Sequence, residues 1–123
     1  MTAAELTPER TVAAIADLAA DRKALDIVSL DLRGMIGYAD YFVICSGRTD
    51  RQTHAIHDAV HAGMKSAYGL LPRRVEGLSE ARWILMDYLD VIVHVFTPDT
   101  REYYRLEQLW GEAPALAVPA GVA

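Results

Sequence analysis

Two apolar runs in the C-terminal half of the chain lie only two residues apart. They are Trp83–Tyr88 and Val91–Phe96, and a gap this short joins antiparallel strands in a hairpin. Asp87, Asp90 and His94 interrupt the apolar character of this segment. A carboxylate or an imidazole near a core costs several kcal/mol unless it is paired or put to use. The segment therefore predicts a buried hairpin whose polar residues have a specific task.

Capping residues mark three helices. Thr7 supplies a capping hydroxyl, Pro8 suits the first helical position, and Glu9 places an acid in the first turn. Asp50, or Thr49 just before it, begins a second helix. The predicted helices are Pro8 to about Lys23, Asp50–Tyr68 with Gly69 after it, and Pro98–Leu109 with Thr97 before it and Gly111 as its end.

Three further segments are predicted as strands. Asp26–Leu32 is rich in β-forming residues, and Tyr41–Ser46 is a continuous apolar run of the kind found in central strands. Val75 follows Pro72 closely and suits a short edge strand. Strands that alternate with helices predict an α/β fold. We expect a single domain over residues 1–111 with a mixed β-sheet flanked by helices on both faces, and a flexible C-terminal tail over 112–123.

Composition limits the classes of function. The 123 residues are 52% hydrophobic, which is enough to build a core. A formal charge of −5 argues against a protein that holds nucleic acid mainly through phosphate contacts, and favours a basic protein as partner. The single cysteine, Cys45, lies in an apolar run and predicts a reduced, buried thiol. No signal peptide and no membrane span are recognisable, so a cytoplasmic protein without a membrane partner is expected.

Two ordered blocks of sequence resemble the ribosomal silencing factor (RsfS or Iojap) family. The first is A-D-Y-F-V-I-C-S-G-R-T-D-R-Q-T-H-A-I at Ala39–Ile56. The second runs from Glu76-Gly77 through W-x-x-x-D-Y and D-V-x-V-H-V-F to R-x-Y-Y-x-L-E-x-L-W, ending at Trp110. The chain departs from the family pattern at Leu89, where glycine is usual, and at Arg48-Thr49, where Asn-Ser is common.

The resemblance implies translational silencing without catalysis. Members of the family are expected to bind the large ribosomal subunit through ribosomal protein L-fourteen, to block its joining to the small subunit when nutrients are limiting, and to form homodimers. This activity requires affinity for the large subunit and enough volume to block the small subunit. Neither a cofactor nor a metal is therefore expected. On this basis the predicted contact residues are Trp83, Asp87, Tyr88, Asp90 and His94. Asp87 and Asp90 can alternatively cap the turn, and His94 can be a hydrogen-bonded core residue.

A small magnesium-dependent nucleotidyltransferase is the alternative function. Such an enzyme pairs a Gly-Ser turn with strand carboxylates, and Ser46-Gly47, Asp87 and Asp90 are the candidates here. The Asp-x-Asp spacing that puts two acids on one side of a strand is missing, and so is a Gly-rich phosphate loop. A nucleotidyltransferase-like topology without catalysis is therefore favoured. A structural or dimerisation protein is a third interpretation.

Three histidines share the predicted helix Asp50–Tyr68. His57 and His61 have the spacing of a zinc-binding helix, with His54 one turn before them. Cysteine or glutamate partners at metal-site spacing are missing, and helical geometry turns the three away from the apolar face. We therefore predict a solvated polar stripe and no metal site.

Overall fold

The computed structural model describes residues 6–109 and 115–116. Its helices and strands follow one another in the order expected of an α/β chain. They are α1 (Pro8–Asp21), β1 (Leu25–Asp31), β2 (Tyr41–Ser46), α2 (Asp50–Tyr68), β3 (Arg74–Glu76), β4 (Trp83–Asp87), β5 (Val91–Phe96), α3 (Pro98–Tyr104), α4 (Leu106–Leu109) and β6 (Ala115–Leu116).

The strands form one mixed sheet in the order β3-β4-β5-β2-β1-β6. β2 and β5 are parallel, with Tyr41 opposite Val91 and Ser46 opposite Phe96, whereas the other neighbouring strands are antiparallel. The predicted hairpin of β4 and β5 is confirmed, and β2 and β5 at the centre are buried along their whole length. The predicted α/β class with a mixed sheet is therefore correct.

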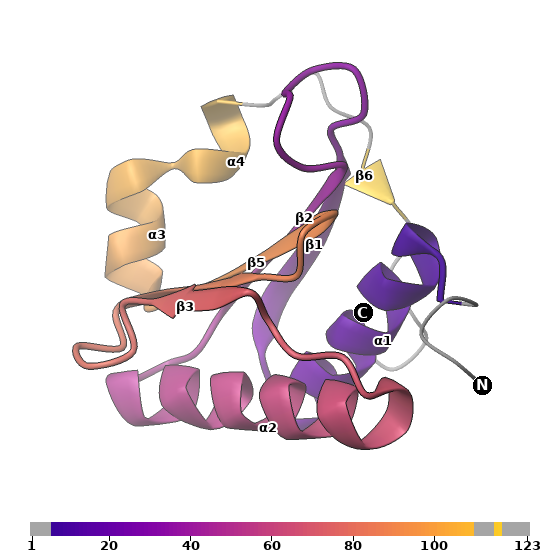
Figure 1. The fold of residues 1–123 in the computed structure, drawn as a ribbon. Coiled ribbons are helices and arrows are strands. Elements are labelled where there is room, and N and C mark those ends of the chain that lie inside the picture. The colour runs from indigo at the N-terminus through magenta and orange to yellow at the C-terminus, as the bar shows by residue number, and fades with distance from the viewer. Residues whose placement is uncertain (1–5, 110–114, 117–123) are drawn as a thin grey trace.

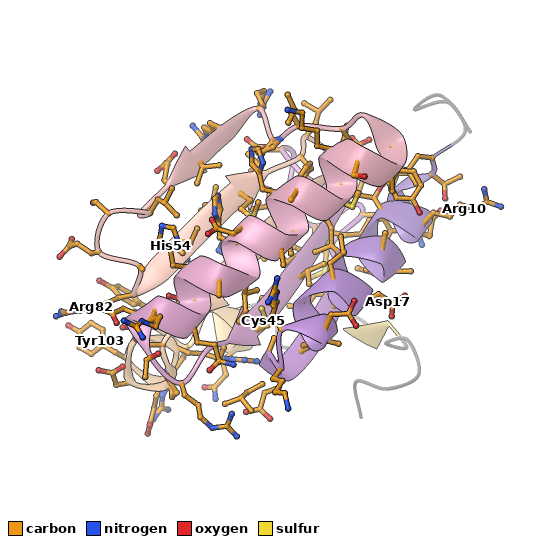
Figure 2. All side chains as sticks on the ribbon, turned by 90° about the horizontal axis from the view of Figure 1, so that it is seen from below. Arg10, Asp17, Cys45, His54, Arg82 and Tyr103 are labelled. Atoms are coloured by element: carbon orange, nitrogen blue, oxygen red, sulfur yellow. The ribbon has the colours of Figure 1, made fainter. Side chains whose placement is uncertain are left out.

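Helices α1 and α2 lie side by side over one face of the sheet (Figures 1 and 2). Alternate strand residues such as Val43, Cys45 and Val93 point toward them and build the larger core. Gly63 of α2 lies against Leu18 of α1, so closely that an added Cβ would overlap the leucine side chain. Figure 2 shows Cys45 beneath the two helices, where it is fully buried as predicted.

Helices α3 and α4 lie over the opposite face, as Figure 1 shows. The core on this side is smaller and includes Phe42, Ile44, Ile92 and Phe96, with Leu106 of α4 packed against it. Within α3 none of the residues is buried. Helices thus cover both faces, as predicted, but this second face is only partly covered, and part of it is left accessible.

The caps of α1 and α2 act as predicted, whereas Thr97 precedes α3 without a side-chain cap hydrogen bond. The Thr7 hydroxyl accepts the amide N–H of Arg10, and the Thr49 hydroxyl accepts that of Gln52. Gly69 ends α2 in a left-handed conformation with φ +66°. Each side chain or glycine satisfies backbone groups that a helix end leaves unpaired, which explains why these ends were predictable from local sequence.

The third predicted helix is interrupted. Pro98–Leu109 was expected to be continuous, but α3 ends at Tyr104, Arg105 adopts a left-handed conformation with φ +48°, and α4 begins at Leu106. The break lets Leu106 turn toward the second-face core. Arginine gives no local signal for such a break, and Gly111, predicted to end the helix, lies outside the described residues.

The predicted tail contains a strand. Ala115 and Leu116 of β6 pair antiparallel with Leu30 and Ser29 of β1, so this part of 112–123 joins the sheet. Two residues are too short for a periodic pattern, which is why the sequence did not predict them. The other tail residues lie outside the described ones, so the boundary at 111 stays a prediction. Among the described helices, none is long and apolar enough to cross a membrane.

Candidate functional site: an aromatic surface around Trp83

Trp83 opens β4 on the second face of the sheet and is half-buried there. Its indole Nε1–H donates to Nδ1 of His94 on β5, with 3.0 Å between the nitrogens. Because an indole nitrogen can only donate, the neutral His94 carries its proton on Nε2. Within the described chain this buried Nε2 has no hydrogen-bond partner. Burial lowers the pKa of His94 to about 4, so the ring is neutral at pH 7.

Aromatic rings lead from this pair to the solvent. Trp83 lies 4.9 Å from Phe96 and 4.8 Å from Tyr104 between ring centroids, and Tyr104 meets Tyr103 edge-on at 5.0 Å. Tyr103 is 80% exposed and Tyr104 is 51% exposed. The exposed ring of Tyr103 packs on Tyr104, which packs on the half-buried Trp83. These rings offer apolar area already held in place, as in the anchors of protein interfaces.

Two shallow pockets flank Trp83. One, of about 280 Å³, lies between Trp83 and Tyr104 and has Glu80 at its edge. The other, of about 290 Å³, lies between Trp83 and Leu85 and has Glu76 at its edge. We call this region the Trp83 surface, and it comprises Glu76, Gly77, Glu80, Trp83, Leu85, Tyr103 and Tyr104. Arg82 also lines the first pocket, and Glu76 is ion-paired with Arg74 at 3.2 Å. An apolar centre with a charged rim matches the usual anatomy of a protein interface.

Gly77 is required by the loop that borders the Trp83 surface. It has φ +80°, and a Cβ at this position would collide with the backbone carbonyl of Trp83. The loop after β3 can therefore pass close to β4 only if residue 77 is glycine. This gives a physical reason for the Glu76-Gly77 pair in the family pattern.

Asp87 is held inside the protein by its own chain. Its Oδ1 accepts the amide N–H of Leu89 at 2.8 Å, and its Oδ2 accepts Nη2 of Arg73 at 2.9 Å, with Nε of Arg74 at 3.5 Å. Burial opposes ionisation, but the Arg73 hydrogen bond, the Leu89 amide and the two guanidinium charges outweigh it and hold the pKa of Asp87 below its ordinary value. Its side chain is only 2% exposed.

The turn between β4 and β5 separates Tyr88 from Asp90. Tyr88 is buried in the core under α1 and α2, where burial raises the pKa of its hydroxyl. Leu89 is 54% exposed and adopts φ +79°, a left-handed conformation that favours the glycine of the family pattern. Asp90 is exposed, and its backbone carbonyl accepts the amides of Asp40 and Tyr41.

The five residues predicted from sequence do not form one surface. Trp83 and His94 are in contact on the second face, whereas Tyr88 lies in the core of the first face. Asp90 lies beyond the far end of β4, and the strand alone separates Trp83 from Asp87 by roughly 13 Å. Trp83 is half-buried and Asp90 is exposed, so these two can contact a partner directly. Asp87, Tyr88 and His94 are buried.

The elements of the nucleotidyltransferase alternative are also separated. Ser46 ends β2 opposite Phe96, while Asp90 precedes β5 at the other end of the same parallel pair, roughly 20 Å away along the strands. Asp87 is already engaged by Arg73 and Leu89. In the part of the chain that the structure describes, no group of three or more His, Cys, Asp or Glu residues is placed to hold a metal.

One of the three histidines on α2 differs from the prediction. His54 is exposed and His61 is partly exposed, but His57 is buried, with Nδ1 2.9 Å from Oδ1 of Asp58. His54 contacts the other oxygen of Asp58 at 3.2 Å. The predicted solvated stripe is therefore wrong for His57, because its flank of α2 is covered by neighbouring structure that helical periodicity cannot reveal.

Solved structures of two bacterial proteins share this fold. A protein from Chromobacterium violaceum matches with a TM-score of 0.83 at 29% sequence identity, covering 95% of this chain and 96% of that one. A protein from Bacillus halodurans matches with a TM-score of 0.73 at 37% identity, covering 85% and 94% of the two chains. The architecture described above is therefore shared with experimentally determined structures.

Sequence comparison identifies the family. The family model described as "Ribosomal silencing factor during starvation" matches residues 5–122. Ribosomal silencing factor RsfS of Bacillus subtilis is 44% identical over 102 residues, which is 83% of this chain and 86% of that protein. A mouse protein named "Mitochondrial assembly of ribosomal large subunit protein 1" is 34% identical over 78% of this chain and 43% of its own length. With its two sequence blocks and its fold, the chain belongs to the ribosomal silencing factor (RsfS) family.

Proposed function

We propose that this protein silences translation by binding the large ribosomal subunit through ribosomal protein L-fourteen and blocking access of the small subunit. Membership of the family supports the ribosomal role, and the name of the mouse relative points to the large subunit. The observation that carries the docking proposal is the Trp83 surface. There exposed Tyr104 lines one pocket with Trp83 and Glu80, and Glu76 lines the other pocket beside Trp83.

The mechanism is steric and involves no catalytic step. The net charge of −5 attracts a basic ribosomal protein, and the charged groups of the rim set its orientation. The aromatic rings supply the area that loses water on binding. Once bound, the domain occupies space needed by the small subunit. Asp87 and His94 act indirectly, because Asp87 fixes the hairpin turn and His94 orients the indole of Trp83. The protein acts in the cytoplasm, and it acts as a homodimer in the free state.

Cosedimentation tests the proposal. The full chain is spun through a sucrose cushion with isolated large subunits, with isolated small subunits, and with both under conditions that normally join them. We expect the protein to pellet with the large subunit alone and to reduce the amount of joined particles. Absence from the large-subunit pellet at moderate salt would overturn the proposal.

Charge reversal locates the docking surface. Glu80→Lys on the Trp83 surface is expected to weaken large-subunit binding by roughly threefold or more, because a rim charge alters encounter with a basic partner. Asp17→Lys makes the same change in net charge on α1, over the opposite face of the sheet, where Figure 2 shows Asp17 pointing outward. Equal binding by the two variants would show that the partner docks elsewhere.

A further inference from the structure

The pocket between Trp83 and Tyr104 combines aromatic walls with charged groups. Its volume is about 280 Å³, and the residues that line it are Gly77, Glu80, Arg82, Trp83, Thr100 and Tyr104. Two of these side chains are aromatic, one is an acid and one is a base. This lining restricts which side chain of a docking partner can enter the pocket.

The aromatic walls favour a cationic group. The rings of Trp83 and Tyr104 are tilted by 48° with 4.8 Å between their centroids, and Tyr104 is 51% exposed. The face of an aromatic ring attracts a cation, most strongly when the ring is an indole. Since Nε1–H of Trp83 donates to His94, the indole that lines the pocket is held in one orientation.

Glu80 is the only acid among the described residues that line this pocket. It is exposed, and within the described chain its carboxylate makes no ion pair and no hydrogen bond. Glu76, which lines the other pocket beside Trp83, differs because Nε of Arg74 lies 3.2 Å from its carboxylate. A cation of the partner therefore finds an unused acceptor at Glu80, whereas at Glu76 it competes with Arg74.

Arg82 lines the same pocket, but its charge is offset by a neighbouring acid. Hydrogen bonds from Thr97 and Thr100 lower the pKa of Asp99, and the positive charge of Arg82 lowers it as well, so Asp99 is ionised at pH 7 close to Arg82. Opposite charges at close range reduce each other's field. The negative charge of Glu80 is therefore left available to a cation of the partner.

An arginine side chain satisfies the ring faces and the carboxylate together. Its guanidinium is planar, so one face can lie against an aromatic ring while N–H groups at its edge donate to a carboxylate. A lysine ammonium is a compact, strongly hydrated charge that cannot stack on a ring in this way. An apolar side chain would take water from the Glu80 carboxylate without replacing its hydrogen bonds.

We propose that this pocket receives an arginine side chain of the basic protein that docks on the Trp83 surface, with the guanidinium against the aromatic wall and its N–H groups on Glu80. The inference rests on the proposed function, because the partner is the ribosomal protein named there. It adds that Glu80 and Tyr104 recognise a single side chain together. Their contributions to binding therefore depend on each other.

A double-mutant cycle on large-subunit binding tests this dependence. Glu80→Gln removes the charge with little change of shape, and Tyr104→Leu removes the aromatic face but keeps an apolar side chain. Each substitution alone should weaken binding roughly threefold. Independent effects would give a roughly ninefold loss in the double variant, whereas a shared arginine predicts a loss of roughly threefold, because the first substitution already releases it.

Glu76→Gln removes the same charge from the paired glutamate of the Trp83 surface and should weaken binding less than Glu80→Gln. Asp17→Asn on α1 is the distant control and should leave the affinity unchanged. Equal losses from Glu76→Gln and Glu80→Gln, or independent losses at Glu80 and Tyr104, would overturn the proposal. Circular dichroism and thermal unfolding of each variant establish that it is folded.

A titration without ribosomes separates failure of this inference from failure of the proposed function. N-acetylarginine amide, or its uncharged analogue N-acetylcitrulline amide, is added to the isotopically labelled full chain at millimolar concentration, and the NMR signal of the Trp83 indole N–H is followed. The arginine amide should shift this signal clearly more than the citrulline amide, and Glu80→Gln should remove the difference. Equal shifts, or no shift, would contradict the arginine pocket. An arginine-specific shift without large-subunit binding would support the pocket and overturn only the proposed function.

Discussion

The indole of Trp83 donates a hydrogen bond to Nδ1 of His94 across the β4–β5 pair, at 3.0 Å. The same histidine lies 4.6 Å from Phe42 and 6.1 Å from Phe96 between ring centroids, so it is enclosed by aromatic side chains. The bond places the indole between two small pockets. His94 was predicted as either a core residue or a contact residue, and its burial fits the core alternative.

Acid should destabilise the fold through His94. Its pKa falls from an ordinary value of 6.5 to about 4 in the folded protein, so the unfolded chain binds more protons between these values. The contribution of His94 to the free energy of unfolding is fully present above pH 6.5. It declines as the pH falls toward 4, by about 3 kcal/mol in total. Urea unfolding at pH 7 and pH 4.5 measures the loss.

His94→Asn is the test variant. The asparagine Oδ1 can accept the hydrogen bond of the Trp83 indole N–H, and the asparagine side chain has no group that ionises in this pH range. It should show a much smaller difference between the two pH values. His54→Asn on the exposed side of α2 is the control and should keep the full difference. A His94→Asn protein as acid-sensitive as the unmodified one would contradict the assignment.

Loss of the Asp87 carboxylate should destabilise the hairpin. Asp87→Asn leaves Arg73 without its anionic acceptor and should lower the free energy of unfolding by about 2 kcal/mol. Arg73→Ala should cost less, about 1 kcal/mol, because Arg73 is exposed and Arg74 remains near the carboxylate. Since the pKa of Asp87 is lowered, its contribution is present above pH 3.8 and is lost as the pH falls further. Equal costs of the two substitutions in urea unfolding at pH 7 would argue against this description.

Gly77→Ala should be severely destabilising, by about 3 kcal/mol or more, because the new Cβ meets the Trp83 carbonyl. Gly34→Ala is the matched control. Gly34 also has φ +80°, but the space around it is open, so only the conformational cost of about 1 kcal/mol applies. Thermal unfolding of both proteins compares the two costs, and similar values would mean that the collision is relieved by a small backbone shift.

Leu89→Gly should stabilise the protein slightly. The positive φ of Leu89 costs the folded state roughly 1–2 kcal/mol of conformational energy. Glycine removes this strain but lowers the free energy of unfolding by roughly 0.5–1 kcal/mol, because the unfolded chain gains conformational entropy. The free energy of unfolding, measured with urea, should therefore rise by up to about 1 kcal/mol. Leu71→Gly, at another exposed leucine without this conformation, should instead lower stability. A loss at both positions would show that Leu89 makes a compensating contact.

Asp90 tests whether the docking region extends to the β4–β5 turn. Asp90→Lys should weaken binding to the large subunit while leaving the far-UV circular dichroism spectrum unchanged, because the side chain is exposed and its backbone makes the structural hydrogen bonds. Cosedimentation measures the effect. Unchanged binding would remove Asp90 from the contact region and leave the Trp83 surface as the proposed docking site.

Local sequence determined most of the secondary structure. Thr7 and Thr49 begin helices because their hydroxyls accept backbone amides within the same turn, and Gly69 ends one because it adopts positive φ freely. The two-residue alternation of a strand correctly placed His94 on the face opposite Val93 and Val95. These effects depend on residues only a few positions apart, so the sequence alone reveals them.

Tertiary structure decided how the polar residues are used. Asp87 is satisfied by Arg73, 14 positions earlier, because β3 pairs with β4. Tyr104 reaches Trp83 only because α3 ends at Tyr104 and folds over the second face. Contacts between distant segments follow from the burial and pairing of the whole chain, which one short motif does not specify. The sequence therefore determined the elements and the family, while the separation of the five predicted residues and the shape of the Trp83 surface were decided by the fold.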